Sequence, residues 1–173
     1  MPFAETFSLI KTPKQLHTFD FTTLPKKDFV LKPNHGSKGR GIFIITAEEK
    51  NLFRIGDKYL TEATLKHQLA DILDGAYSMT SDDTILIEEK LIPGAGFEDF
   101  CTYGLADIRI IVFNLVPVAS MIRVPTKKSG GKANISAGGI GCGIDLKSGK
   151  VFSTFVQGKL YKKKFPKEYQ PYQ

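Results

Sequence analysis

The residues best suited to chemistry in this sequence lie in a short glycine-rich segment. The segment reads Gly36-Ser37-Lys38-Gly39-Arg40-Gly41. Glycines leave backbone N–H groups unobstructed, and the two cations between them would attract phosphate groups. A Walker A loop leads into a helix and ends in Gly-Lys-Ser/Thr, whereas this segment runs into the β-forming residues 42–46. The pattern therefore predicts a hairpin flap over phosphates, with a mobile surface hairpin as the alternative.

Polar residues at the ends of two apolar runs could complete such a site. Lys32 stands just before the glycine segment and shares a strand face with Val30, so its ammonium could reach phosphate oxygens as a point charge. Glu88 and Glu89 close an apolar run before Leu91, where exposed backbone groups could read an adenine edge. The alternatives are a solvated strand-end lysine and two solvated carboxylates.

A third group of polar residues lies in the second half of the chain. Asp107 and Arg109 are two apart in a strand and point to one side, where the guanidinium could stabilise charge developing on an acyl phosphate. A local ion pair between them is the alternative. Arg123 lies in the partner strand, and Lys132 and Asn134 follow a glycine hinge in a loop that could close over a ligand. Taken singly, these residues would be ordinary surface groups.

Several other kinds of site are excluded by the spacing of the residues. The run 139–143 lacks both the GxGxxG spacing and a following helix, so it is not a dinucleotide fingerprint, and we expect a tight entry to the last hairpin there. Cys101 and Cys142 have no CxxC spacing and the three histidines lie far apart, which excludes a disulfide framework and a zinc cluster. We expect both cysteines to be small core or loop residues.

Alternation of short β-like runs with turn signals favours an α+β domain dominated by an antiparallel sheet. Strands are expected at residues 29–33, 42–46, 84–88, 107–115 and 117–125, and hairpins at 52–60 and 143–155. The first two strands should be antiparallel neighbours joined by the glycine segment. Thr61 can cap the one clear helix, which Gly75 stops. The apolar face of that helix consists of Leu65, Leu69, Ile72 and Leu73.

Composition limits the class of protein and its partners. The 173 residues match one ordinary domain, and a hydrophobic content of 42% can build a core. The sequence has neither a run of ~18 apolar residues nor a basic start followed by an apolar stretch, so we expect a cytoplasmic protein without a membrane partner. The net charge of +6 suits an anionic partner. Lysines and aromatic residues in 159–173 could contact nucleic acid, but a solvated tail is the favoured interpretation.

Four segments, read in order, resemble the core motifs of one known family. They are FVLKPNHGSKGRGIFIIT, TILIEEKL, LADIRIIVFNLVPVASMIRVPT and GKANISAGGIGCGIDLKSGK. The set is similar to that of the alpha-L-glutamate ligase-like branch of the ATP-grasp superfamily, which includes ribosomal-protein glutamate ligase-related and sugar-transfer-associated ATP-grasp proteins. The resemblance runs from about Phe7 to Phe155 and is more specific than any glycine pattern within it.

The resemblance implies ATP and Mg²⁺ as cofactors. It implies that Lys32 and the glycine segment bind the ATP phosphates, that Glu88, Glu89 and Leu91 border the adenine, and that Asp107 lies near the nucleotide. Mg²⁺ would bridge the phosphates.

The resemblance also implies a reaction. Arg109 and Arg123 would lie toward the transferred phosphoryl or acyl group. Related ligases carry Arg-Ser-Asn in contact with ATP where this sequence has Lys132-Ala133-Asn134, so the amide is kept and the cation is a lysine. In the implied cycle ATP phosphorylates a carboxylate substrate, and an amine substrate, an amino acid or peptide, attacks the acyl phosphate. No side-chain nucleophile is required, in agreement with the absence of a Ser/His/Asp or Cys/His arrangement.

The resemblance further predicts that the chain carries only part of the fold. Full-length relatives begin with an additional domain and continue to strands with Asp, Glu and Asn metal ligands, so no residue here is assigned to a metal. We expect a partial ATP-grasp domain at 1–158, incomplete at both ends, and a basic connector or tail at 159–173. The chain alone should bind ATP weakly or not detectably and should show no ligase turnover, and a complementing C-terminal segment or subunit should restore tight Mg-ATP binding. A non-catalytic anion- or nucleic-acid-binding module is the alternative function.

Overall fold

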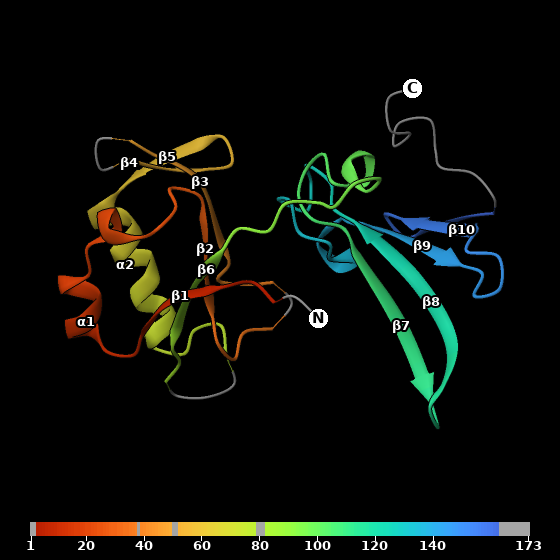
Figure 1. The fold of residues 1–173 in the computed structure, drawn as a ribbon, viewed down its shortest axis with the longest axis horizontal. Coiled ribbons are helices and arrows are strands. Elements are labelled where there is room, and N and C mark those ends of the chain that lie inside the picture. The colour runs from red at the N-terminus through yellow and green to blue at the C-terminus, as the bar shows by residue number, and fades with distance from the viewer. Residues whose placement is uncertain (1–2, 38, 50–51, 79–81, 163–173) are drawn as a thin grey trace. The chain divides into compact units, whose positions relative to one another are not determined.

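The chain folds into two compact units, Met1–Leu91 and Ile92–Gln173, each built on an antiparallel sheet. The structure, a computed structural model, describes residues 3–37, 39–49, 52–78 and 82–162 (Figure 1). Within these residues strands outnumber helices, so the predicted α+β class with a mainly antiparallel sheet is confirmed. The boundary between the units falls inside the segment 1–158 that the sequence analysis treats as one partial domain.

Unit 1 contains a six-stranded sheet in the order β1-β6-β2-β3-β4-β5. Its strands are β1 (Thr6–Ile10), β2 (Phe29–Pro33), β3 (Phe43–Glu49), β4 (Leu52–Ile55), β5 (Lys58–Thr61) and β6 (Ile85–Glu89). Phe29 lies opposite Ile45 and Leu31 lies opposite Phe43, so β2 and β3 form the antiparallel hairpin predicted around the glycine segment. The turn at Gly56 joins β4 to β5, also as predicted.

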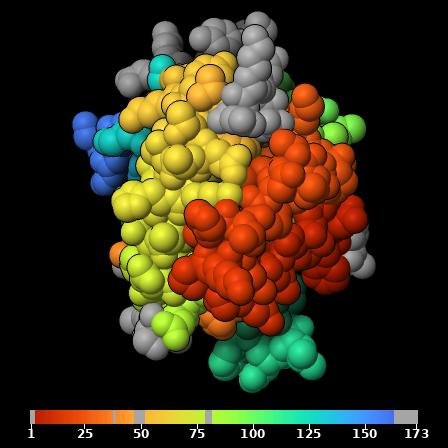
Figure 2. Space-filling model, turned by 90° about the vertical axis from the view of Figure 1, so that its left-hand side faces the viewer, coloured from red at the N-terminus to blue at the C-terminus, as the bar shows by residue number. Residues whose placement is uncertain are grey.

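The described residues of unit 1 form two α-helices. They are α1 (Pro13–Thr18) and α2 (Glu62–Leu73), and a 3-10 helix, η1 (Phe21–Thr23), follows α1. Helix α2 packs on one face of the sheet, and α1, red in Figure 2, lies beside α2, which is yellow there. Thr61 caps α2 by accepting a hydrogen bond from the Thr64 N–H, as predicted. Strand β1 and helix α1 were not predicted from the sequence, because elements of five and six residues carry little periodicity.

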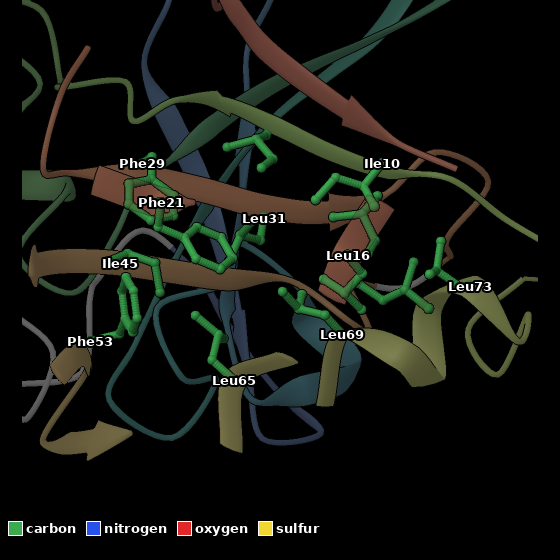
Figure 3. Close-up of a cluster of buried hydrophobic side chains, with 13 residues drawn as sticks. Ile10, Leu16, Phe21, Phe29, Leu31, Ile45, Phe53, Leu65, Leu69 and Leu73 are labelled. Carbon is green, nitrogen blue, oxygen red and sulfur yellow. The ribbon is translucent and has the colours of Figure 1, made fainter. Parts of the chain in front are cut away.

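The core of unit 1 lies between the sheet and α2 (Figure 3). Three phenylalanines form its aromatic part. The Phe21 ring stacks on Phe29 with centroids 6.0 Å apart, and Phe53 meets these two rings edge-on at 5.2 and 6.3 Å. Leu65 and Leu69 of α2 are fully buried against the sheet, which confirms the predicted apolar face of the helix. Because strands β2, β3, β4 and β6 all contribute to this core, it determines how they lie against α2.

Unit 2 contains a five-stranded sheet in the order β11-β10-β9-β8-β7. Its strands are β7 (Asp107–Phe113), β8 (Val116–Val124), β9 (Ile140–Ile144), β10 (Val151–Val156) and β11 (Lys159–Lys162), and its 3-10 helices are η2 (Glu98–Phe100) and η3 (Ile135–Ala137). Strands β7 and β8 form the predicted hairpin. Its turn residues, Asn114 and Leu115, both have positive φ, which is typical of a two-residue hairpin turn.

The structure of unit 2 differs from expectation at two places. The glycine-rich run 139–143, expected as a tight entry to the last hairpin, contains most of strand β9. Its glycines permit close packing: a Cβ on Gly141 would lie 2.5 Å from Cδ1 of Ile135. The expected tail begins with strand β11, which pairs with β10 and packs Tyr161 against the core of the unit. The remaining tail residues, 163–173, lie outside the described part of the chain.

The two cysteines occupy different environments, as a core and a loop residue. Cys142 in β9 is buried, and burial raises the pKa of its thiol to about 11, whereas Cys101 is half-buried at the end of η2. Only the thiolate reacts with iodoacetamide, so we expect Cys101 to be alkylated about tenfold faster or more in the folded chain near neutral pH. Mass spectrometry of the two peptides measures the rates, and the urea-unfolded chain is the control with similar rates. Equal rates in the folded chain would contradict the burial of Cys142.

Candidate functional site

The face of the unit 1 sheet that turns away from α2 forms the first part of the candidate site. Burial alternates along β2, so that Phe29 and Leu31 lie in the core whereas Val30 and Lys32 are half-buried on the other face, called the open face below. The strand register adds three half-buried residues to the open face, namely Ile44, Leu86 and Glu88. These five residues of the open face are therefore three apolar side chains and one pair of opposite charges.

Lys32 and Glu88 form that pair. The distance from the Lys32 Nζ to a Glu88 carboxylate oxygen is 2.5 Å, and the two side chains are 35% and 16% exposed. Glu89 points to the opposite side of the sheet, because neighbouring residues of a strand alternate, and it pairs with Lys26. Leu91 is exposed at the end of unit 1. The structure thus brings one of the two predicted carboxylates to Lys32 and separates the other from it.

The glycine loop, defined as residues 34–41, connects β2 to β3 and turns tightly at its centre. The Arg40 N–H donates a hydrogen bond to the Ser37 carbonyl at 3.2 Å, and Gly39 has a φ of +70°. Glycine adopts this conformation without the strain that a Cβ would cause. The side chains of Ser37 and Arg40 are exposed and can be reached by a ligand, while Lys38 lies outside the described residues.

Both ends of the glycine loop pack so closely that two of its glycines have no room for a side chain. A Cβ on Gly36 would lie 2.3 Å from Cγ of Pro33. Gly41 has a φ of +71°, and a Cβ there would lie 2.6 Å from the ring of Tyr77, which follows α2. This packing constrains the loop at Gly36 and Gly41, which favours the predicted flap over a surface hairpin without contacts at these two glycines.

Asp83 ties the start of the glycine loop to the end of α2. Its carboxylate is 1% exposed and accepts hydrogen bonds from the backbone N–H groups of His35 and Thr84 at 3.1 and 2.7 Å. The Nδ1 atom of the His35 ring lies 3.1 Å from the same carboxylate. The Asp83 N–H donates to the Leu73 carbonyl at 3.2 Å, and the Asn34 N–H donates to the Thr84 carbonyl at 2.9 Å.

These hydrogen bonds also favour the ionised form of Asp83. Burial alone raises the pKa of the carboxyl group, but the hydrogen bonds from Thr84 and His35 outweigh burial and hold the pKa of Asp83 below its ordinary value. A carboxyl with a lowered folded pKa stabilises the fold above the unfolded pKa, and this contribution is lost as the pH falls through the folded pKa. Asp83 is therefore a carboxylate at neutral pH, and its hold on the loop weakens only in acid.

Neither Asp83 nor Tyr77 was predicted from the sequence to be a site residue, although both contact the glycine loop. An aspartate directly before a strand is commonly a turn residue, and no local pattern distinguishes a buried one. The hydrogen bonds of Asp83 reach a partner 48 residues away along the chain. The sequence offered one indication of this contact, namely the position of Asp83 beside the predicted strand β6. A strand of the same sheet had to lie next to β6, and Asp83 would then lie near the end of that strand.

The second group of candidate residues lies on β7 and β8 of unit 2. Asp107 lies opposite Arg123, whose Nε donates a hydrogen bond to Oδ1 of Asp107 at 2.7 Å. Hydrogen bonding to Asp107 raises the pKa of Arg123. Arg109 lies opposite Met121 and is exposed, and it forms no ion pair within the described part of the chain. The pair considered between Asp107 and Arg109 is therefore replaced by a pair across the two strands.

The loop that carries Lys132 and Asn134 is held by its own contacts. Asn134 caps η3, because its Oδ1 accepts hydrogen bonds from the Ser136 N–H and hydroxyl at 3.1 and 2.8 Å. Gly131 crosses another part of the backbone so closely that a Cβ would lie 2.4 Å from the Tyr103 carbonyl oxygen. The expected glycine hinge is therefore packed against a neighbouring segment, and the half-buried Lys132 follows directly after it.

The residues that the structure describes lack two classes of feature. No group of three or more His, Cys, Asp or Glu side chains among those residues could hold a metal ion. None of the helices there has the length and apolar character needed to cross a membrane.

The fold and the match to a family model define the class of this protein. The glycine loop joins two antiparallel strands, and Lys32 lies in the first of them, as the resemblance to ATP-grasp proteins led us to expect. The model of the family described as "Sugar-transfer associated ATP-grasp" matches residues 1–168, and the chain belongs to this family. No curated protein and no solved structure matches it. The ATP-grasp resemblance is thereby confirmed, and the chain is an ATP-binding, ligase-like core.

Proposed function

We propose that the chain is the ATP-binding core of a ligase that joins a carboxylate to an amine through an acyl phosphate. The observation that carries the proposal is the glycine loop beside the Lys32–Glu88 pair, in a chain of the ATP-grasp family. The proposed substrates are a carboxylate and the amine of an amino acid or peptide.

The residues of unit 1 fit a nucleotide. Backbone N–H groups of the glycine loop and the exposed Arg40 are suited to the phosphates, and Lys32 adds a point charge at the base of the loop. The apolar side chains of Val30 and Leu86 offer a surface on which an adenine ring can lie. The described residues hold no cluster of metal ligands, so we assign Mg²⁺ to none of them, and no step depends on it.

The proposed chemistry has two steps. A carboxylate oxygen attacks the γ-phosphorus of ATP and ADP leaves; the amine nitrogen then attacks the acyl carbon, inorganic phosphate leaves, and the surplus proton of the amine passes to solvent. Both steps require positioning and charge stabilisation rather than a protein nucleophile. We propose that the exposed Arg109 stabilises charge on the transferred group and that Arg123, oriented by Asp107, assists it. Lys132 and Asn134 are proposed as further nucleotide contacts.

Lys32→Ala is expected to weaken ATP binding about tenfold, because one charge-assisted contact to a phosphate contributes on the order of 1.5 kcal/mol. Lys58→Ala is the matched control, since Lys58 is exposed on β5 and its loss changes the net charge equally. NMR titration of the ¹⁵N-labelled variants with ATP measures both affinities, even when they are weak. Thermal unfolding of each variant shows whether the fold is retained.

The alternative function, a non-catalytic anion- or nucleic-acid-binding module, gives a different result in the same titration. A module that acts through its net charge of +6 should lose similar affinity in both lysine variants. It should also bind a single-stranded oligonucleotide at least as tightly as ATP, with an affinity that falls steeply with salt. That combination would contradict the nucleotide site at Lys32.

A further inference from the structure

We propose that Asp83 is a positioning residue for the phosphates of the nucleotide. Its carboxylate determines where the glycine loop leaves β2, and therefore the direction in which the loop presents its backbone N–H groups. The inference rests on the function proposed above, in which this loop is the phosphate-binding element. It gives a role in ligand binding to a residue outside the loop.

The hydrogen bonds of Asp83 converge on a single residue of the loop. The backbone N–H of His35 lies 3.2 and 3.1 Å from the two carboxylate oxygens, and Nδ1 of the His35 ring lies 3.1 Å from one of them. An ionised carboxylate only accepts hydrogen bonds and has two oxygens with which to do so. It can therefore hold the backbone and the ring of His35 at the same time.

Asp83 can direct the loop because its own position is determined by other elements. Its N–H donates to the carbonyl of Leu73, the last residue of α2. The next residue, Thr84, donates its N–H to the Asp83 carboxylate and accepts a hydrogen bond from the Asn34 N–H. With a side chain that is 1% exposed, the carboxylate cannot exchange these partners for water without opening the structure. The start of the loop is thus fixed relative to α2 and β6.

The end of the loop rests on the same part of the chain. Tyr77, which also follows α2, contacts Gly41 so closely that a Cβ would lie 2.6 Å from its ring. The described residues between α2 and β6 therefore hold both ends of the glycine loop. A substitution at Asp83 would release the start of the loop while its end stays in contact with Tyr77. We therefore expect the loop to change its conformation but to remain between β2 and β3.

Asp83→Asn tests the proposal with almost no change in volume. The amide group offers one acceptor oxygen, and its NH₂ cannot accept the hydrogen bonds that His35 donates. We expect the affinity for inorganic tripolyphosphate to fall about tenfold, while the affinity for adenosine, which does not use the loop, stays within about twofold. Hydrogen exchange of the His35 amide should become about tenfold faster. Asp71→Asn, at an exposed residue of α2, is the matched control and should change none of these quantities.

The measurements distinguish two roles of Asp83, the positioning of the loop for phosphate binding and the stabilisation of the fold alone. Equal losses of affinity for both ligands, or an unchanged affinity for tripolyphosphate despite faster exchange at His35, would overturn the proposal. If Asp83→Asn fails to fold, His35→Ala provides a second test, because it removes the contact of the His35 ring with Asp83 and keeps the contact of the backbone N–H. We expect His35→Ala to weaken tripolyphosphate binding by a factor of about three. An unchanged affinity in His35→Ala would overturn the proposal. A wild-type chain that binds neither ligand would overturn the proposed function together with this inference.

Discussion

Replacing Phe29 by alanine is expected to lower the free energy of unfolding of unit 1 by about 3–5 kcal/mol. Phe29 is 1% exposed, and its ring packs against Phe21 and Phe53. The three rings come from β2, η1 and β4. Removing the Phe29 ring leaves a cavity between these elements, and the cavity can close only if β2 moves. Strand β2 also carries Lys32. A loss of this size is a large fraction of the stability of an ordinary domain. Urea unfolding measures the change in the free energy of unfolding, and hydrogen exchange of the β2 and β6 amides in a separate experiment shows whether these strands are destabilised.

The control for this prediction is Phe3→Ala, which removes the same atoms from a side chain that is 87% exposed. We expect its free energy of unfolding to stay within about 0.5 kcal/mol of the wild type, because little apolar area returns to water. If the two variants were destabilised equally, Phe29 would not be the centre of the core. Retained stability in Phe29→Ala would lead to the same conclusion.

Gly41→Ala is expected to destabilise unit 1 by about 1–3 kcal/mol and to weaken ATP binding about tenfold. The φ of +71° at Gly41 is unfavourable for alanine, and the new methyl group would lie 2.6 Å from the Tyr77 ring. The ring or the loop must therefore move. Since the loop end connects directly to β3, the backbone N–H groups of the loop would no longer face the phosphates in the same direction. Urea unfolding and titration with ATP measure the two effects.

Gly56→Ala separates backbone strain from the contact with Tyr77. Gly56 has a φ of +59° in the turn between β4 and β5, and a Cβ there would meet nothing within 4 Å. This control therefore carries a similar backbone penalty of about 1 kcal/mol, without a clash and without an effect on ATP affinity. An unchanged ATP affinity in Gly41→Ala would argue against the glycine loop as the phosphate-binding element.

Local patterns in the sequence were sufficient for the elements that carry the glycine loop. The β-forming residues on both sides of the loop and the absence of a helix signal predicted the β2–β3 hairpin, and the structure confirms it. The spacing of Leu65 and Leu69 predicted the buried face of α2, and Thr61 predicted its start. These features depend on residues close together in the chain, so a single sequence contains the information.

Elements stabilised by distant partners could not be recognised in this way. Strand β11 reads as a basic tail, since only its pairing with β10 makes it a strand. The glycine run of β9 was expected as an entry to the last hairpin and not as a strand, because Ile135, the neighbour that leaves no room for a side chain at Gly141, is recognised only from the packing. Strand β1 is too short to have a clear pattern and gains its place from pairing with β6.

The sequence by itself determined the order of the candidate residues, with Lys32 directly before a loop rich in glycine and cations, and their ATP-grasp character. The tertiary structure decided how the charges pair. It placed Glu88 with Lys32 on the open face and joined Arg123 to Asp107 across two strands. The physical reason is that the alternation of side chains along a strand is a local property of the chain. The register between strands and the burial of a residue such as Asp83 depend instead on contacts between segments that are distant in the chain.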